Sequence, residues 1–143
     1  MNGISHDLVL KLRSKLKKEE GLRLKPYKCT KGFTTIGIGR NLDTNGLSEH
    51  EANYLFENDL SNIFVDLNRN LPDWKFHALN VQIVLCDMCF NLGIKKLLKF
   101  KKFLEAIEDC EYELAIEEIK DSLYYQQVKN RANRNISLIE DLL

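Results

Sequence analysis

The chain has 143 residues, of which 44% are hydrophobic, enough for one sizeable core but few for two independent domains. Its 21 basic and 21 acidic residues cancel, so the net charge gives no reason to expect nucleic acid as a partner. No segment approaches the roughly 20 apolar residues of a membrane span, and the N-terminus lacks the apolar centre of a signal peptide. We therefore expect one domain over residues 1–143 that stays in the cytoplasm without stable membrane insertion.

The first predicted element is a helix over residues 5–20. Ser5 can cap its first turn, and Gly21 supplies a stop signal. Leucines recur every four residues along it: Leu8, Leu12 and Leu16. The pattern places Glu20 on the last turn of this helix.

The next segment predicts a β-hairpin. Leu22, Leu24 and Tyr27 lead to a turn at Lys31-Gly32, and the β-rich residues 33–36 follow. Cys29 and Thr35 flank this turn. A hairpin would therefore bring their side chains near each other.

A long helix is predicted after the hairpin. Ser48 and Glu51 have the spacing of a capping box, and the helix should end before Leu71. One apolar stripe runs along it: Ala52, Leu55, Phe56, Leu60, Ile63, Phe64 and Leu67.

The segment from Phe76 to Leu92 is apolar on nearly every face, which is typical of the buried central helix of a helical lobe. Gly93 closes it, and three shorter amphipathic stretches follow. Their apolar positions are Phe100, Phe103, Leu104 and Ile107, then Leu114, Ala115 and Ile119, then Ile136 and Ile139. The expected fold class is α+β, with a β-containing lobe over about residues 21–60 and a helical lobe over about 67–143.

The four cysteines form no disulfide ladder, which indicates a reducing compartment. Cys86 and Cys89 form a CxxC pair that is compatible with redox chemistry or half a zinc site. No second CxxC or paired histidine follows, so core packing within the apolar helix is the favoured interpretation. We expect no metal and no cofactor.

Charge is unevenly distributed. The stretch from Lys11 to Lys31 contains nine basic and two acidic residues, whereas acidic residues dominate from Glu105 to Asp121. Each stretch is compatible with an ordinary solvated helix face. The functional alternative for the first is a basic surface that meets a polyanion such as a bacterial cell wall.

Glu20 is the first candidate for chemistry. A carboxylic acid at a helix C-terminus faces the negative end of the helix dipole, which favours its protonated form. Hydrolysis of a glycosidic bond needs such an acid at the leaving oxygen. A single Glu before Gly is, however, more often structural than catalytic.

Three stretches of sequence resemble the bacteriophage T4-type lysozymes, glycoside hydrolase family 24. EEGLRLKPYKCTKGFTTIGIGR at 19–40 is similar to the family's active-site segment, CDMCFNLG at 86–93 to its central helix, and QVKNRANR at 127–134 to its C-terminal motif. The family triad is Glu, eight residues, Asp or Cys, five residues, then Thr. Glu20, Cys29 and Thr35 meet this spacing.

The resemblance implies a lysozyme-like fold: two lobes joined by a long helix, a cleft between the lobes, and the helix over 5–20 packed on the helical lobe. It implies hydrolysis of the β-1,4 bond between N-acetylmuramic acid and N-acetylglucosamine in peptidoglycan, with Glu20 as the acid. Cys29 replaces the Asp of the best-known members. A thiol has a reference pKa of about 8.5 and acts as a base only where the thiolate is favoured; nearby Lys28 and Lys31 could favour it. Thr35 would position the attacking water.

The resemblance also suggests supporting residues in the helical lobe. Arg131 would pair with the catalytic acid, unless it only docks the last helix. Phe90 and Asn91 would end the central helix at the cleft and contact sugar, although Phe90 also suits the core. Arg40 stands where the best-known member has a His, a difference that should affect stability more than chemistry.

Three functions remain open from the sequence. The first is a hydrolase that inverts the anomeric centre; the second is a lytic transglycosylase, which needs the acid but no water; the third is a non-catalytic wall-binding module, against which the intact triad spacing argues. The expected enzyme is a monomer that acts on periplasmic peptidoglycan for phage release, after passing the membrane through a pore made by a separate holin.

Overall fold

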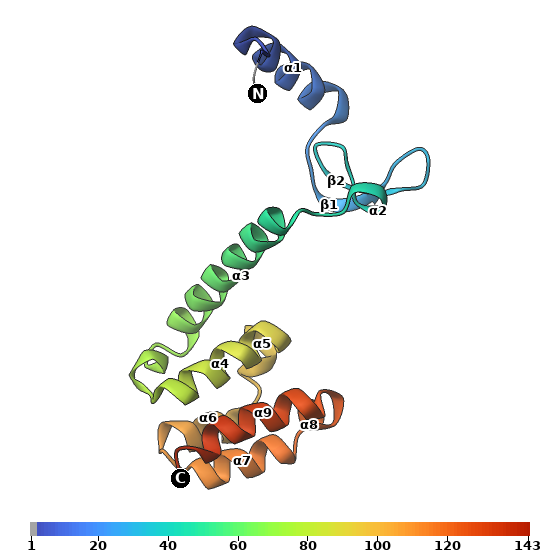
Figure 1. Cartoon of the computed structure of the whole chain (residues 1–143). Coiled ribbons are helices and arrows are strands. Elements are labelled where there is room, and N and C mark those ends of the chain that lie inside the picture. Colours follow the sequence, from blue (N-terminus) through green and yellow to red (C-terminus); the bar gives the residue numbers. More distant parts are fainter. Residues whose placement is uncertain (1–2) are drawn as a thin grey trace. The chain divides into compact units, whose positions relative to one another are not determined.

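A computed structural model describes residues 3–143, and the chain divides into two compact units, one up to Asn53 and one from Tyr54 to Leu143. The division lies inside the long helix α3 (Glu49–Asn70), which is drawn in green in Figure 1. The mostly helical chain with a small antiparallel sheet confirms the α+β fold class. The cleft between the lobes and the packing of the N-terminal helix on the helical lobe stay predictions.

The first unit begins with α1 (His6–Glu20), which confirms the predicted helix and its two signals. The Leu8 N–H donates to the Ser5 hydroxyl at 3.1 Å, and Gly21, with φ of 71°, ends the helix. No residue of α1 is buried. Glu20 is its last residue, as predicted.

A three-stranded antiparallel sheet follows, in the order β1 (Arg23–Lys28), β2 (Thr34–Gly37) and β3 (Arg40–Asn41). Thr35 lies opposite Tyr27 on one side and Asn41 on the other, so it sits in the central strand. The short helix α2 (Leu42–Asn45) packs beside β2 and β3. The predicted hairpin is confirmed, and the sheet gains a third strand that the sequence pattern did not indicate.

An ion pair joins β3 to the first turn of α3. The Arg40 guanidinium contacts the Glu51 carboxylate at 2.8 and 3.0 Å, and it also donates to the Gly46 carbonyl at 3.1 Å. Glu51 accepts from the Ser48 N–H while the Ser48 hydroxyl accepts from the Glu51 N–H, which confirms the capping box. The guanidinium of Arg40, foremost, and the Ser48 bonds lower the pKa of Glu51 to about 2.

Replacing Glu51 by glutamine should lower the Tm at neutral pH and flatten the pH dependence of stability. A carboxyl whose pKa falls on folding stabilises the protein above its unfolded pKa of 4.5, and this contribution is lost as the pH drops toward 2. Thermal melts of the parent and E51Q between pH 7 and 2 measure the effect. Glu49→Gln, on the same turn and exposed, is the control; equal shifts for both variants would contradict the role of the ion pair.

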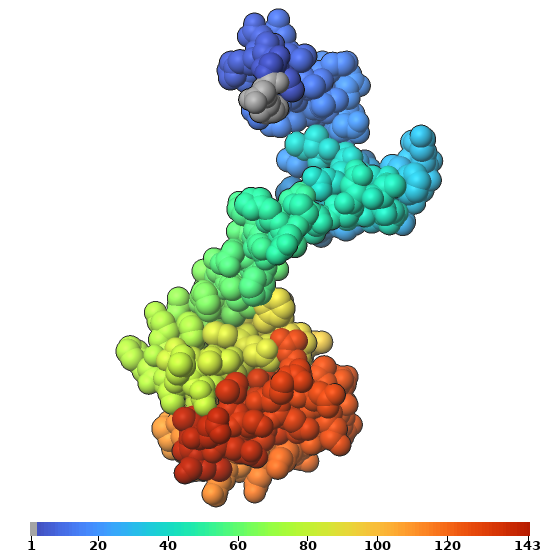
Figure 2. Space-filling model, in the orientation of Figure 1, coloured from blue at the N-terminus to red at the C-terminus, as the bar shows by residue number. Residues whose placement is uncertain are grey.

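The second unit consists of the rest of α3 and a set of shorter helices, which are coloured from light green to red in Figure 1. They are the 3-10 turn η1 (Trp74–Phe76), α4 (Leu79–Leu92), α5 (Ile94–Leu97), α6 (Lys101–Glu108), α7 (Tyr112–Lys120), α8 (Leu123–Gln127) and α9 (Lys129–Glu140). α7 packs against both α6 and α9, and α9 packs against α4. Figure 2 shows α7 and α9, in orange and red, closely packed.

The core of this unit surrounds α4, as predicted. Val81, Val84 and Met88 are fully buried in it, and the later helices contribute mainly the predicted apolar positions. These contributions are Phe103, Ile107, Ala115, Ile119, Ile136 and Ile139. The predicted Leu114 is instead 40% exposed, and Ile116 takes its place in the core.

The start of the central helix was predicted wrongly. α4 begins at Leu79, and Phe76 lies in the preceding 3-10 turn with 85% of its surface exposed. Trp74 supplies the anchor instead: it is buried, stacks on Phe64 with ring centroids 6.0 Å apart, and donates from Nε1 to Asn68 at 2.8 Å. Apolar content alone did not distinguish these two aromatic residues.

The predicted long helix is confirmed as α3, which ends at Asn70, before Leu71; of its apolar stripe, Ile63 and Leu67 are buried. None of the helices in residues 3–143 combines the length and apolar character needed to cross a membrane.

Candidate active site

The tight turn after β1 holds Cys29 and Thr35 together. The Cys29 N–H donates to the Phe33 carbonyl at 2.9 Å, and the Gly32 N–H donates to the Cys29 carbonyl at 2.8 Å. Gly32 has φ of 83°, which only glycine adopts readily. The turn therefore returns the chain into β2 so that Thr35 lies beside Cys29, as the hairpin prediction required.

The Cys29 thiol lies among backbone N–H groups of this turn. Hydrogen bonds from the backbone of Lys31, foremost, and of Phe33 lower the pKa of Cys29, and bonds from the Thr35 side chain and the Gly32 backbone act in the same direction. Such converging N–H groups stabilise an anion. The expectation that the lysine side chains would favour the thiolate is corrected: the backbone supplies the stabilisation. The local pattern Lys31-Gly32 predicted the turn, not its N–H geometry.

Thr35 is the buried member of the pair, with 4% of its surface exposed. Its hydroxyl donates to the Phe33 carbonyl at 3.0 Å and also lies within hydrogen-bond reach of the Cys29 sulfur. A hydroxyl has one proton to donate and lone pairs to accept with. Fixed beside the Cys29 sulfur, this hydroxyl can orient a water molecule.

Glu20 belongs to the same unit as Cys29 and Thr35. It is exposed at the end of α1, and its side chain lies beside Gly39 in the turn between β2 and β3. Two residues of β2, Ile36 and Gly37, separate Thr35 from this turn. The first unit thus contains an exposed acid and a separate thiol–hydroxyl pair.

Two polar side chains support this sheet, and the sequence analysis missed one of them, Asp43. The Asp43 carboxylate accepts from the Thr34 N–H at 2.7 Å, and Lys28 donates to the Thr34 hydroxyl at 2.6 Å. Asp43 lies in α2, whose N-cap Asn41 accepts from the Thr44 N–H at 3.0 Å. Asn41 followed by Asp43 is a cap signal that could have revealed α2.

In the second unit, Arg131 of α9 is paired with Asp87 of α4. Arg131 Nη2 donates to Asp87 Oδ1 at 2.7 Å, and Nε donates to Oδ2 at 3.0 Å, which is the geometry of a two-point pair. The sequence analysis named Arg131 but not this partner. Its pairing with Glu20 stays a prediction.

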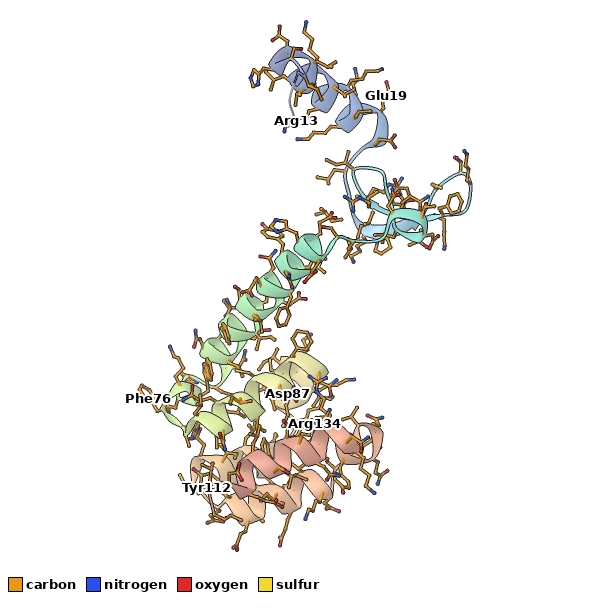
Figure 3. The ribbon with its side chains drawn as sticks, viewed as in Figure 1. Arg13, Glu19, Phe76, Asp87, Tyr112 and Arg134 are labelled. Carbon is orange, nitrogen blue, oxygen red and sulfur yellow. The ribbon has the colours of Figure 1, made fainter. Side chains whose placement is uncertain are left out.

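The pair continues into a buried amide. Asn135, 4% exposed, donates from Nδ2 to Asp87 Oδ2 at 2.8 Å and to the hydroxyl of buried Tyr124 at 3.0 Å. Burial raises the pKa of Asp87, but the bonds from Arg131 and Asn135 outweigh it and hold that pKa below its usual range. Figure 3 shows Asp87 on α4 facing Arg134 on α9, a second positive charge near the carboxylate.

Replacing Asp87 by leucine should destabilise the protein by about 1–3 kcal/mol, because one N–H of buried Asn135 loses its acceptor. At roughly 2–4 °C per kcal/mol for a chain of this size, the Tm should fall by about 2–12 °C. Asp87→Asn keeps an acceptor oxygen in place and should lose less. Thermal melts of both variants test this, and an unchanged Tm in D87L would show that the network contributes no stability.

Phe90 and Asn91, the predicted sugar contacts, are both exposed at the end of α4. Phe90 makes an edge-to-face contact with Phe56 of α3, with ring centroids 6.1 Å apart. It also lines a largely apolar groove of about 560 Å³ within the second unit, next to Cys86 and Asp87. An exposed ring beside a groove is compatible with sugar contact, which stays a prediction.

The CxxC pair lies on α4, with Cys89 buried and Cys86 half-buried, and both thiols are free. Burial, foremost, raises the pKa of Cys86 to about 11, which favours the unreactive thiol form. Across residues 3–143, no three His, Cys, Asp or Glu side chains are grouped to hold a metal ion.

Comparison with known proteins places these observations in a family. The family model described as phage lysozyme matches residues 17–134. The chain is 32% identical to the probable T4-type lysozyme 1 of Dictyostelium discoideum, over 93% of this chain and 95% of that one. It is 30% identical to the endolysin of Salmonella phage P22, over 56% of this chain and 59% of that one.

A further match concerns a larger protein. The chain is 32% identical, over 87% of its length, to the pre-baseplate central spike protein Gp5 of Enterobacteria phage T4. This chain spans only 26% of the length of that spike protein.

Proposed function

Since the chain belongs to the phage lysozyme family and is a peptidoglycan-hydrolysing glycosidase, we propose that it cuts the β-1,4 bond between N-acetylmuramic acid and N-acetylglucosamine. The proposed products are glycan fragments with a reducing muramic end. The single observation that carries the proposed mechanism is the tight turn that brings Cys29 and Thr35 together, closed by the Cys29–Phe33 and Gly32–Cys29 backbone hydrogen bonds.

In the proposed reaction, Glu20 acts as general acid. Its proton passes to the bridging oxygen as the bond to the anomeric carbon breaks, so the leaving sugar departs as a neutral alcohol. The exposed position of Glu20 at the end of α1 leaves its carboxyl accessible to a polymeric substrate.

Cys29 and Thr35 act on the attacking water. The Thr35 hydroxyl orients the water, and the Cys29 thiolate accepts one of its protons as the oxygen bonds to the anomeric carbon. Atoms balance: the sugar gains a hydroxyl, Cys29 becomes a thiol, Glu20 becomes a carboxylate, and solvent restores both groups. Attack from the face opposite the leaving group inverts the anomeric centre.

In this proposal, three residues of the second unit assist the reaction by contacting the substrate or supporting the acid. Phe90 and Asn91 contact the sugar chain, and Arg131 supports the acid. The basic residues of α1 and β1 favour approach to the anionic wall, an effect that salt should weaken.

The proposed biological role is degradation of the host wall for phage release. The enzyme acts as a monomer, collects in the host cytoplasm and reaches periplasmic peptidoglycan through a holin pore. The endolysin match supports this role over one in entry, while the match to a spike protein is the observation that favours entry as the alternative.

The chemical form of the product ends distinguishes hydrolysis from transglycosylation. Purified peptidoglycan is digested in water enriched in ¹⁸O, and the fragments are analysed by mass spectrometry. Hydrolysis puts one ¹⁸O into each new reducing muramic end. A 1,6-anhydro end without ¹⁸O would instead establish a lytic transglycosylase, in which the sugar's own hydroxyl attacks. Intact glycan would indicate a non-catalytic wall-binding module. The E20Q protein supplies the blank.

A further inference from the structure

Gly39 lies in the turn between β2 and β3, directly against the side chain of Glu20. A β-carbon built on Gly39 would lie 2.8 Å from Glu20 Oε2, 2.9 Å from its Cδ and 3.0 Å from its Cγ. Non-bonded carbon atoms normally stay about 3.5–4.0 Å apart. The Glu20 carboxyl group therefore occupies the space that a side chain at position 39 would need.

A second glycine, Gly37 at the end of β2, provides a comparison. Gly37 has φ of 70° and Gly39 has φ of 67°, so both adopt the left-handed backbone that favours glycine. A β-carbon on Gly37 would meet nothing within 4 Å, however. The two positions share a positive φ, and only Gly39 lies against Glu20.

We infer that Gly39 is a positioning residue for the catalytic acid: its missing side chain lets the Glu20 carboxyl rest against the turn. This inference rests on the proposed role of Glu20. Glu20 is exposed, and a free glutamate side chain samples many rotamers. Contact with the rigid backbone of the sheet restricts that freedom on one side.

The chemistry of the contact decides what a substitution does. The atoms that a new β-carbon meets belong to the far end of a flexible side chain rather than to backbone. Glu20 can rotate away and leave the fold unchanged. Gly39→Ala should therefore move the acid away from its working position. The cost in stability should be little more than that of placing any non-glycine residue in a left-handed backbone conformation.

The test compares Gly39→Ala with Gly37→Ala. Both alanines would have to adopt a similar positive φ, so the two variants should show similar falls in Tm. A displacement of about 1 Å in a reacting group can cost on the order of 10²-fold in rate. We expect kcat to fall by about 10²-fold in G39A with KM nearly unchanged, and to stay within about threefold of the parent in G37A. Soluble peptidoglycan fragments serve as substrate.

A double variant shows whether Gly39 acts through Glu20. If it does, adding Gly39→Ala to E20Q should reduce the remaining activity by less than about twofold, because the acid that it positions is already absent. Equal losses in G39A and G37A, or a full multiplication of the two losses in the double variant, would overturn the inference.

A further pair guards against a folding defect. Asparagine tolerates the left-handed backbone better than alanine yet carries the same β-carbon. Gly39→Asn and Gly37→Asn should repeat the contrast in kcat if the alanine variants fail to fold. Failure of the proposed function is distinguishable: E20Q would then keep the parent's activity, whereas an inactive E20Q with a fully active G39A would refute only the positioning role.

Discussion

Glu20→Gln is expected to abolish nearly all lytic activity while the protein melts normally. Glutamine keeps the shape of the side chain beside Gly39 but has no proton to transfer to the leaving oxygen. General acid catalysis is typically worth about 10²–10⁴-fold, so the loss should lie in this range. Because Glu20 is exposed, the substitution should leave the Tm close to that of the parent.

The measurement is clearance of a turbid suspension of permeabilised Gram-negative cells, together with a thermal melt. Glu19→Gln is the matched control: Glu19, labelled in Figure 3, is the exposed neighbour of Glu20 on α1 and carries the same charge. Its 3.4 Å contact with Lys15 lies between two exposed side chains and contributes little to stability. E20Q activity within a few-fold of E19Q would remove Glu20 from the role of acid.

Cys29→Ala should lose most of the activity, whereas Cys29→Asp should retain it. Alanine can neither accept a proton nor hold water, while aspartate supplies a carboxylate base in the same turn. Cys110→Ala, at an exposed thiol, should leave activity unchanged. Full activity in C29A would make Cys29 structural and would favour the transglycosylase, which needs no water.

The same two proteins should differ in their pH profiles. The Cys29 pKa is lowered, so the thiolate persists to lower pH than an ordinary thiolate does, and activity should fall as the pH drops through that pKa. In C29D this acid limb should move to still lower pH, since the reference pKa of Asp is about 3.9. Identical acid limbs would mean that Cys29 does not titrate in the reaction.

Signals that depend on neighbouring residues in the sequence were predicted well. Ser5 and Gly21 bound α1, Ser48 and Glu51 cap α3, and the Lys31-Gly32 turn forms, because each depends on local backbone hydrogen bonds or on a left-handed glycine. The triad spacing indicated Cys29 and Thr35 as site residues, and the hairpin brings them together. The motif identified the residues without describing their surroundings.

Features that depend on distant residues or on backbone direction were missed. Asp87 and Arg131 are 44 positions apart, and nothing in either local sequence indicates the other. The N–H groups around the Cys29 sulfur exist only once the turn has closed. Trp74 rather than Phe76 anchors the start of the helical unit because the chain reverses there, a tertiary effect that apolar content does not reveal.

The span of the contacts in each unit has a consequence for the order of assembly. The sheet pairs residues at most 14 positions apart, and Arg40 reaches Glu51 across 11. The network at Asp87 must instead close a segment of 44 residues, and the Asn80 side chain bonds to the Leu138 carbonyl across 58. Short-range contacts form faster because less chain entropy is lost before they form. On a ribosome, the turn that carries Cys29 and Thr35 can therefore be complete while α9 is still unsynthesised.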